Sequence, residues 1–485
     1  MRLVDRARIG TGPRWLGPGG RHQPVLAADR LRVRARRQYL LDGVWQLSVQ
    51  PRFIVVRHHE RLRRASLRAD LPLPGWTGLR RPDGQRDAQR LGRVLARFWC
   101  PGVGEGPGAW IRSPAVAIAQ AKAFRAEFPV FERVSYLNAG TEGPVPAAAV
   151  QAARERIELE ASHGRSGKAF FEGLLEMAQA VRAAYARLLR SGAEQVALTG
   201  STTDGVNTVL AGLDLRPGDE ILTTDEEHPG LLAPLGQARR RQGIRVRVAP
   251  FERVADEVSS DTRLVACSHV SWVSGRVVDT AALKRSGASV LLDAAQAIGA
   301  IPVDVDELGC DFYAASGQKW LCGPEGSGCL FIREERLDEC SIPWPSYGSL
   351  ADPQRPLEVE PAAGAARFDH GFPSGLRSAW VLASLEVLGA PGWDWVHARA
   401  AGLALSLANR LRERGAVEVL PRGASTLVSW RLPDRRDPAQ EVERLAAAGF
   451  VLRSIPSHGG LIRASVGAWS SEEELEALVE TASRT

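Results

Sequence analysis

The sequence predicts an α/β protein with a mostly parallel sheet in a large domain, followed by a smaller C-terminal α+β domain. From about residue 115 onward, short apolar segments of strand length alternate with helical segments. Such segments are typical of parallel strands that helices cover on both faces. After about residue 375, helical stretches surround only a few short strands, which indicates the second domain.

Each element follows from its hydrophobic period or from a local start signal. Residues 174–189 place Met177, Val181 and Tyr185 on one stripe, which predicts a helix. The other elements predicted in the large domain are an amphipathic stretch at 115–128, a helix at 203–213, a tight turn at 323–328, and strands at 196–199, 220–224, 245–250, 264–268, 290–293, 311–314 and 329–332. Those of the small domain are helices at 378–388, 396–414 and 438–448 and strands at 426–431 and 462–465. Ser471 precedes Glu474 by three residues, a capping-box spacing that predicts the start of a last helix.

The first 112 residues differ chemically from the rest of the chain. They hold 23 arginines, no lysine and 8 acidic residues, whereas residues 113–485 hold 39 basic and 48 acidic residues. We therefore expect an Arg-rich segment at 1–112, a large domain at 113–375 and a small domain at 376–485. Three interpretations of the first segment compete: a disordered basic tail, a nucleic-acid-binding arm, and upstream sequence translated from a start assigned too early. The third is favoured, although residues 53–56 have the pattern of a short strand.

Charge and cysteine usage exclude several classes of function for the rest of the chain. The acidic balance of residues 113–485 gives a nucleic-acid function no electrostatic support. No apolar run approaches 18 residues, and the N-terminus lacks the apolar core of a secretory signal, so neither a membrane span nor secretion is expected. The six cysteines form no CxxC pair and no metal-ligand spacing, so we expect no metal site and a reducing, cytoplasmic compartment.

Lys319 is the most informative single residue. The chain has only four lysines, and Lys319 alone follows an apolar strand and lies between small residues. An amine in this setting suits imine chemistry with an aldehyde, which a guanidinium cannot perform.

Three further segments carry chemically suitable groups. Residues 200–207 follow a strand and open a helix, so backbone amides and hydroxyl groups there make either an anion site or an ordinary helix cap. His228 follows the strand at 220–224, where a histidine is either structural or able to lie against an aromatic ligand. Asp293 ends an apolar strand, and a buried carboxylate there needs a cationic partner or several donors.

Together these segments supply what pyridoxal 5'-phosphate requires. In a doubly wound sheet, Asp293 and Lys319 come to the same crevice at the carboxyl ends of adjacent strands. Lys319 would hold the cofactor as a Schiff base, and Asp293 would keep the pyridine nitrogen protonated. Released by substrate, Lys319 would serve as the base that moves the α-proton.

Residues 128–482 resemble the class V aminotransferase family of fold-type I pyridoxal-phosphate enzymes, which includes cysteine desulfurases and isopenicillin N epimerase. The motifs that carry the resemblance are Tyr136-Leu137-Asn138-Ala139-Gly140, Ser201-Thr202-Thr203-Asp204-Gly205-Val206-Asn207, Glu227-His228, Ser268-His269-Val270-Ser271, Asp293-Ala294-Ala295-Gln296, Ser316-Gly317-Gln318-Lys319-Trp320 and Arg463-Ala464-Ser465. The resemblance implies a seven-stranded sheet in the large domain, a homodimer and a small amino acid or amine as substrate.

The resemblance also implies a role for each matching residue. Lys319, Asp293 and His228 would be catalytic, with His228 stacked on the ring. Gln296 would hydrogen-bond the phenolic oxygen of the cofactor. The groups expected around the phosphate are those of Ser201, Thr202, Thr203, Ser316 and Gln318. Arg463 would clamp a substrate carboxylate, and Asn138 and Trp272 would complete the substrate pocket.

Departures from the family pattern shape the expected reaction. Gln318 stands where many relatives have histidine, Trp272 stands where desulfurases have asparagine, and Phe372 stands where relatives have a threonine that reaches the partner subunit's phosphate. No cysteine follows Cys340, although desulfurases carry their sulfur-accepting cysteine near the loop at 453–460. We therefore expect an aminotransferase-like enzyme and disfavour a persulfide-type cysteine desulfurase. The alternatives are an epimerase or C–S/β-lyase of the same family and a non-catalytic binding protein with this fold.

Overall fold

The structure is a computed structural model that describes residues 114–432 and 437–483. The Arg-rich segment and the strand predicted at 53–56 lie outside these residues. Within them, no helix is long and apolar enough to cross a membrane.

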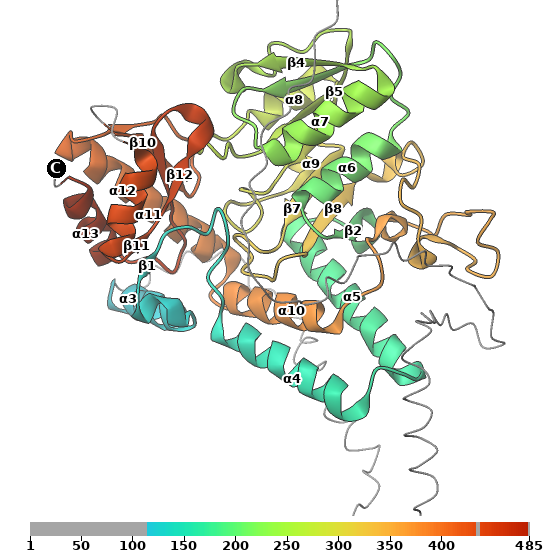
Figure 1. The fold of residues 1–485 in the computed structure, drawn as a ribbon, viewed down its shortest axis with the longest axis horizontal. Coiled ribbons are helices and arrows are strands. Elements are labelled where there is room, and N and C mark those ends of the chain that lie inside the picture. Colours follow the sequence, from blue (N-terminus) through green and yellow to red (C-terminus); the bar gives the residue numbers. More distant parts are fainter. Residues whose placement is uncertain (1–113, 433–436, 484–485) are drawn as a thin grey trace, which may run out of the picture. The chain divides into compact units, whose positions relative to one another are not determined.

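A seven-stranded sheet forms the centre of the larger body (Figure 1). In spatial order its strands are β2 (Val196–Thr199), β8 (Gly328–Ile332), β7 (Phe312–Ser316), β6 (Ser289–Asp293), β5 (Thr262–Ser268), β3 (Glu220–Thr224) and β4 (Arg245–Ala249). The pairs from β7 to β4 are parallel, and β8 runs antiparallel to both of its neighbours. The prediction of a mostly parallel sheet is therefore confirmed.

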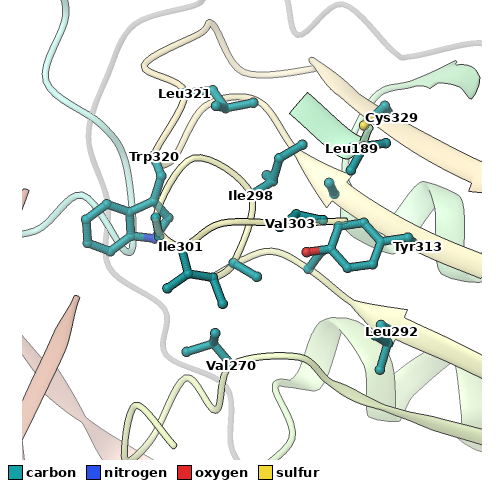
Figure 2. Close-up of a cluster of buried hydrophobic side chains, with 14 of the residues drawn as sticks. Leu189, Val270, Leu292, Ile298, Ile301, Val303, Tyr313, Trp320, Leu321 and Cys329 are labelled. Atoms are coloured by element: carbon teal, nitrogen blue, oxygen red, sulfur yellow. The ribbon is translucent and has the colours of Figure 1, made fainter. Parts of the chain in front are cut away.

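Helices bury both faces of this sheet, because successive strand residues point to opposite sides. On one face, Leu292, Tyr313 and Cys329 pack with Leu189 of α5 (Lys168–Leu189), as Figure 2 shows. On the other face, strand residues pack with α6 (Thr202–Gly212) and α7 (Pro229–Gln242). Along the chain, the shorter helix α8 (Thr280–Ser286) comes between β5 and β6, and α9 (Val305–Leu308) comes between β6 and β7.

A four-stranded antiparallel sheet forms the second body. Its order is β12 (Arg453–Ile455), β13 (Leu461–Ser465), β10 (Leu427–Arg431) and β9 (Glu418–Val419). It packs with α11 (Trp393–Arg414), α12 (Pro438–Ala447) and α13 (Glu472–Ala482) around a core that includes Trp430. Ser471 caps α13 with Glu474, so the predicted capping box is confirmed.

Segments from before the first sheet join this second body. The short strand β1 (Ser135–Tyr136) pairs in parallel with β11 (Phe450–Val451), and Leu137 lies in the same core as Trp430. Helix α3 (Pro114–Ala126) also reaches it, since Arg125 forms an ion pair with Glu474. The division at residues 375 and 376 stays a prediction.

The helical regions show the largest differences from the sequence prediction. Helix α5 begins six residues before the predicted start at 174, because its first turns at Lys168 carry mixed exposed residues that blur the apolar stripe. Helix α4 (Ala147–His163) was missed, since Ala149 is the one buried residue of the helix. It packs on α10 (Gly375–Gly389), which also contacts α5 (Figure 1). The turn predicted at 323–328 is the second half of a longer connection between β7 and β8.

Candidate active site

Asp293 and Lys319 meet at the carboxyl ends of adjacent strands, as the sequence predicted. Asp293 is the last residue of β6, and its Cα pairs with Ser268 of β5 and Ala314 of β7. Its buried carboxylate accepts one hydrogen bond, from the Ala295 amide at 2.9 Å. Burial raises the pKa of Asp293, and the nearby Lys319 amine opposes that rise. The carboxylate is therefore suited to a second positive partner.

The Lys319 amine is held in a state that exchanges protons readily near neutral pH. Burial lowers its pKa to about 8, although Asp293 favours the charged form. The positive charges of Arg463 and Arg453 add to the lowering. A lysine with this pKa can act as a nucleophile or as a base.

Hydroxyl groups from two elements gather at the N-terminus of α6. The Thr202 amide donates to Ser316 Oγ at 2.9 Å, and the two side-chain oxygens lie 2.7 Å apart. Ser201 Oγ accepts from the Asp204 amide at 3.1 Å and so caps the helix. Thr203 lies in the first turn of α6. Ser201 therefore caps the helix, and the hydroxyl groups of Thr202 and Ser316 lie together at the helix N-terminus, where an anion would be favoured.

Gln318 carries an unsatisfied oxygen close to the lysine. Its Oε1 is buried and has no hydrogen-bond partner within residues 114–432 and 437–483. A buried amide oxygen without a donor is costly. A ligand that donates a hydrogen bond would relieve this cost, whereas a fully ionised phosphate would have to contact the Gln318 amide nitrogen instead.

His228 and Trp272 form an aromatic corner of the site. His228 caps α7 and accepts from the Gly230 amide through Nδ1 at 3.0 Å. Its ring meets the Trp272 ring edge-on, with centroids 4.9 Å apart and an angle of 86°. Burial lowers the pKa of His228 to about 4, and Lys319 and Arg453 add to the effect. The imidazole is thus neutral at pH 7 and can cover a flat ligand.

Gly140 keeps open a space between polar groups. A Cβ atom at this position would lie 2.7 Å from Ser465 Oγ and 2.9 Å from both Arg463 Nη2 and Gln296 Oε1. Gln296 donates to the Gly140 carbonyl at 2.7 Å and accepts from Trp320 Nε1 at 3.0 Å. The second amide hydrogen of Gln296 remains for a ligand oxygen.

Arg463 is a buried cation that forms no ion pair with an acidic residue in the part of the chain that the structure describes. It is 0% exposed, and Nη1 donates to the Trp272 carbonyl at 2.7 Å. Its Nε and Nη2 atoms are buried and have no hydrogen-bond partner in the described part of the chain. Burial lowers its pKa to about 9, and Arg453 contributes. A buried guanidinium in this state favours a carboxylate ligand. A surface salt bridge, the alternative weighed for Arg463, is excluded.

Asn138 forms a parallel bridge to Ser465, two residues after Arg463. Its Oδ1 accepts from Thr141 Oγ1 at 2.8 Å. Thr141 in turn accepts from Arg453 Nη1 at 3.0 Å. The structure therefore brings all the predicted substrate residues, Asn138, Trp272 and Arg463, into one connected group.

Sequence reasoning assigned no role to three residues that the structure places here. Arg453 stands on β12 with its Cα opposite Arg463 of β13. Glu227 is buried and accepts from Ser268 and Thr224, which fixes the segment before His228. Glu142 interacts electrostatically with Lys319. The ten-residue spacing of the two arginines across a turn was the available signal for Arg453.

The residues present fit pyridoxal phosphate. The amides and hydroxyl groups at the start of α6 suit its phosphate. The buried Asp293 carboxylate, which accepts one hydrogen bond, suits a positive ring nitrogen, and Lys319 supplies a reactive amine. His228 offers a neutral ring for one face of the cofactor.

Comparisons with known proteins agree with this geometry. The sequence profile described as aminotransferase class V matches residues 135–478. A probable cysteine desulfurase of Methanothermobacter thermautotrophicus is 27% identical over 389 residues, which cover 74% of this chain and 96% of that protein. A cysteine desulfurase of Serratia proteamaculans is 32% identical over 280 residues, which cover 52% of this chain and 67% of that protein.

A solved structure adds information on chemistry. The cystine C–S lyase C-DES, in complex with its reaction product cysteine persulfide, has a TM-score of 0.69 and 27% identity. The match covers 74% of this chain and 99% of that chain.

These comparisons correct the expected type of enzyme. The expectation that disfavoured a persulfide-forming desulfurase in favour of an aminotransferase-like enzyme is wrong, because the similar proteins are cysteine desulfurases and a persulfide-forming lyase. The expectation treated a loop cysteine as indispensable. The C-DES complex shows that the small-molecule product can itself carry the persulfide sulfur in that enzyme.

Proposed function

The chain belongs to the class V aminotransferase family of pyridoxal-phosphate enzymes, and on that premise we propose that it breaks the C–S bond of cysteine or cystine. The observation that carries the proposal is the buried Arg463 guanidinium near the Lys319–Asp293 pair, whose Nε and Nη2 atoms have no hydrogen-bond partner among the described residues. Arg463 would bind the substrate carboxylate, and Lys319 would transfer the proton at the neighbouring α-carbon. The sulfur chemistry of the similar proteins supports the choice of bond.

The cofactor, when bound, withdraws electrons from the substrate α-carbon. The residues of the chain then divide the work. Arg463 orients the substrate through its α-carboxylate. The Lys319 amine, with a pKa of about 8, takes the α-proton and can return it. Asp293 stays ionised while it faces a positive partner, and neutral His228 with Trp272 covers the site against water.

With cystine, the proposed reaction uses one water and needs no oxidant. The bond between the β-carbon and its sulfur breaks, and that sulfur leaves with the other half as cysteine persulfide. The remaining three-carbon fragment takes up water and becomes pyruvate and ammonium. Cys267, Cys310, Cys322, Cys329 and Cys340 are all buried, and a persulfide on the product requires none of them.

The test is product analysis of the cofactor-loaded protein with L-cystine and L-cysteine. Pyruvate, ammonium and persulfide or sulfide in equal amounts would support C–S cleavage. Transfer of the amino group to an added keto acid, or inversion of the substrate α-carbon without sulfur release, would contradict it. Binding without any product would indicate a protein that retains the fold for recognition alone.

We also propose that the chain acts as a homodimer. Phe171 and Phe372 expose 45% and 51% of their surfaces and form an edge-to-face pair with centroids 5.9 Å apart. Leu175 lies on the same helix as Phe171 and is 50% exposed. Exposed apolar side chains gathered in this way are typical of a protein contact surface. Sedimentation should give a dimer, and Phe372→Glu should shift it toward monomer; an unchanged dimer would place the interface elsewhere.

Two expectations about the whole chain stay predictions. Cell fractionation checks the cytoplasmic location. Intact mass of the native protein checks whether it begins at Met1, which would contradict a start assigned too early.

A further inference from the structure

Two arginines face each other across neighbouring strands beside the active site. Arg453 and Arg463 are Cα partners in the antiparallel pair β12–β13, so their side chains project from the same face of that sheet. Like charges directly opposite each other destabilise a sheet. No ion pair to an acidic residue forms at either arginine within residues 114–432 and 437–483. One substrate carboxylate satisfies Arg463, which leaves the second cation unexplained.

Arg453 is held at the rim of the site by contacts of its own. Its Nη1 donates to Thr141 Oγ1 at 3.0 Å, and its Cζ lies 5.8 Å from the centroid of the Trp272 ring. Arg463 is fully buried, whereas Arg453 is partly exposed. The two guanidinium groups therefore differ in depth: Arg463 lies in the protein interior, and Arg453 lies nearer the surface.

An acidic side chain stands next to the residue that anchors Arg453. Glu142 follows Thr141 in a turn whose amides at Thr141 and Glu142 donate to the Asn138 carbonyl. The turn packs on the lysine segment, because the Gly143 amide donates to the Gln318 carbonyl at 2.7 Å. Glu142 is partly exposed and interacts electrostatically with Lys319. The Arg453 cation therefore contacts Thr141, the residue that directly precedes the Glu142 carboxylate in the chain.

We propose that Arg453 and Glu142 form a second subsite that recognises an amino-acid zwitterion at the far end of the substrate. Arg453 binds the distal carboxylate, and Glu142 binds the distal ammonium group. The preferred substrate is then a two-ended sulfur amino acid such as cystine, with Arg463 on the near carboxylate. This inference rests on the proposed function only for the identity of the reacting bond.

The experiment measures binding rather than turnover. The Lys319→Ala variant, kept in excess pyridoxal phosphate, is titrated by calorimetry and by the change in cofactor absorbance. Four ligands separate the two charges: L-cystathionine has a distal zwitterion, S-carboxymethyl-L-cysteine only a distal carboxylate, S-(2-aminoethyl)-L-cysteine only a distal ammonium, and S-methyl-L-cysteine neither.

Added substitutions should change the affinities selectively. Arg453→Gln should lower the affinity for cystathionine and for the carboxymethyl ligand about tenfold or more, as expected for one lost charge-assisted hydrogen bond. The affinities for the aminoethyl and methyl ligands should change by less than about twofold. Glu142→Gln should weaken cystathionine and the aminoethyl ligand instead. Arg453→Lys should restore part of the carboxylate affinity. Arg410→Gln, on the surface of α11, is the control for charge and should change none of the four.

Three outcomes overturn the proposal: equal losses for all four ligands, no loss for any, or loss of binding of all four ligands to the starting Lys319→Ala protein. Circular dichroism of each variant identifies a protein that has failed to fold. If Arg453→Gln does not fold, the affinities of Arg453→Lys for the four ligands are compared instead. If the ligands bind selectively but the unmodified enzyme forms no pyruvate, the proposal of C–S cleavage is contradicted and the proposal of a second subsite is supported. If the unmodified enzyme forms pyruvate but the ligands bind without selectivity, the proposal of C–S cleavage is supported and the proposal of a second subsite is contradicted.

Discussion

The two sides of the candidate site balance their charges differently. On the side of the seven-stranded sheet, the Lys319 cation faces the Asp293 carboxylate, and each raises the charged fraction of the other. On the side of the four-stranded sheet, Arg453 and Arg463 are two cations on paired strands. The first side is prepared for a reaction, because its charges nearly compensate without substrate. The second side is prepared for binding, because only an arriving anion compensates it.

The largest expected effect comes from removing the lysine on the reacting side. Lys319→Ala should lower turnover by at least about 10²–10⁴-fold, since it removes the general base. Borohydride reduction of the loaded enzyme followed by peptide mapping should label Lys319 in the native protein and nothing in the variant. Lys168→Ala is the matched control, because Lys168 is 87% exposed on α5. A label on another residue would contradict the assignment.

The binding side should respond differently to loss of its buried charge. Arg463→Gln should raise KM about tenfold or more, because a carboxylate loses its charge-assisted hydrogen bonds. The ligand-free variant should melt no lower than the native protein, since the uncompensated buried charge is gone. Steady-state kinetics and calorimetry measure the two effects. A large drop in Tm without a change in KM would mean that Arg463 is structural.

Gly140 lies at the boundary between the two sides and tests whether they share one space. In Gly140→Ala, the new methyl group would meet Arg463 Nη2 and Gln296 Oε1 at 2.9 Å. We expect KM to rise several-fold with cofactor loading nearly unchanged, because the methyl group intrudes on the substrate carboxylate. Loading is read from the absorbance of the purified protein. Loss of the cofactor instead of substrate affinity would place the open space on the cofactor side.

The smallest expected effect concerns pH. The folded-state pKa of His228, about 4, is below that of an unfolded histidine, so the unfolded chain binds more protons between pH 4 and 6.5. Stability should therefore fall as pH decreases through this window. His228→Gln should reduce the fall in Tm between pH 7 and pH 5 by about 1–3 °C. His269→Gln would not serve as a control, because burial lowers the pKa of His269 to about 4 as well. An unchanged pH profile would mean that His228 binds protons equally in the folded and the unfolded chain, which would contradict the lowered pKa.

Lys319 and Asp293 were predictable from the sequence because strand ends are local features. Apolar runs fixed β6 and β7 to within two residues, and the carboxyl ends of adjacent parallel strands must share an edge. Ser201 and Thr202 were predicted because a helix start follows a strand there, as α6 follows β2, whereas the role of Ser316 was implied only by the family resemblance.

Other features escaped prediction because they depend on segments far apart in the chain. Helix α4 has too narrow an apolar stripe to be recognised without its partner α10. The Gln296 side chain donates a hydrogen bond to the carbonyl of Gly140, which is 156 residues away in the sequence. The expectation that disfavoured a persulfide-forming enzyme was wrong, since a missing loop cysteine says nothing about where a product can carry sulfur. The C–S/β-lyase predicted as an alternative agrees with the similar proteins.

By itself, the sequence determined the succession along the chain of the strands that form the seven-stranded sheet and the chemistry of the groups at their ends, because both arise from neighbours along the chain. The tertiary structure alone decided that β1 pairs with β11, that Thr141 therefore reaches Arg453, and that the two arginines lie opposite each other. Register between distant strands is set by packing of their buried faces, and no local pattern encodes which distant partner a strand will find.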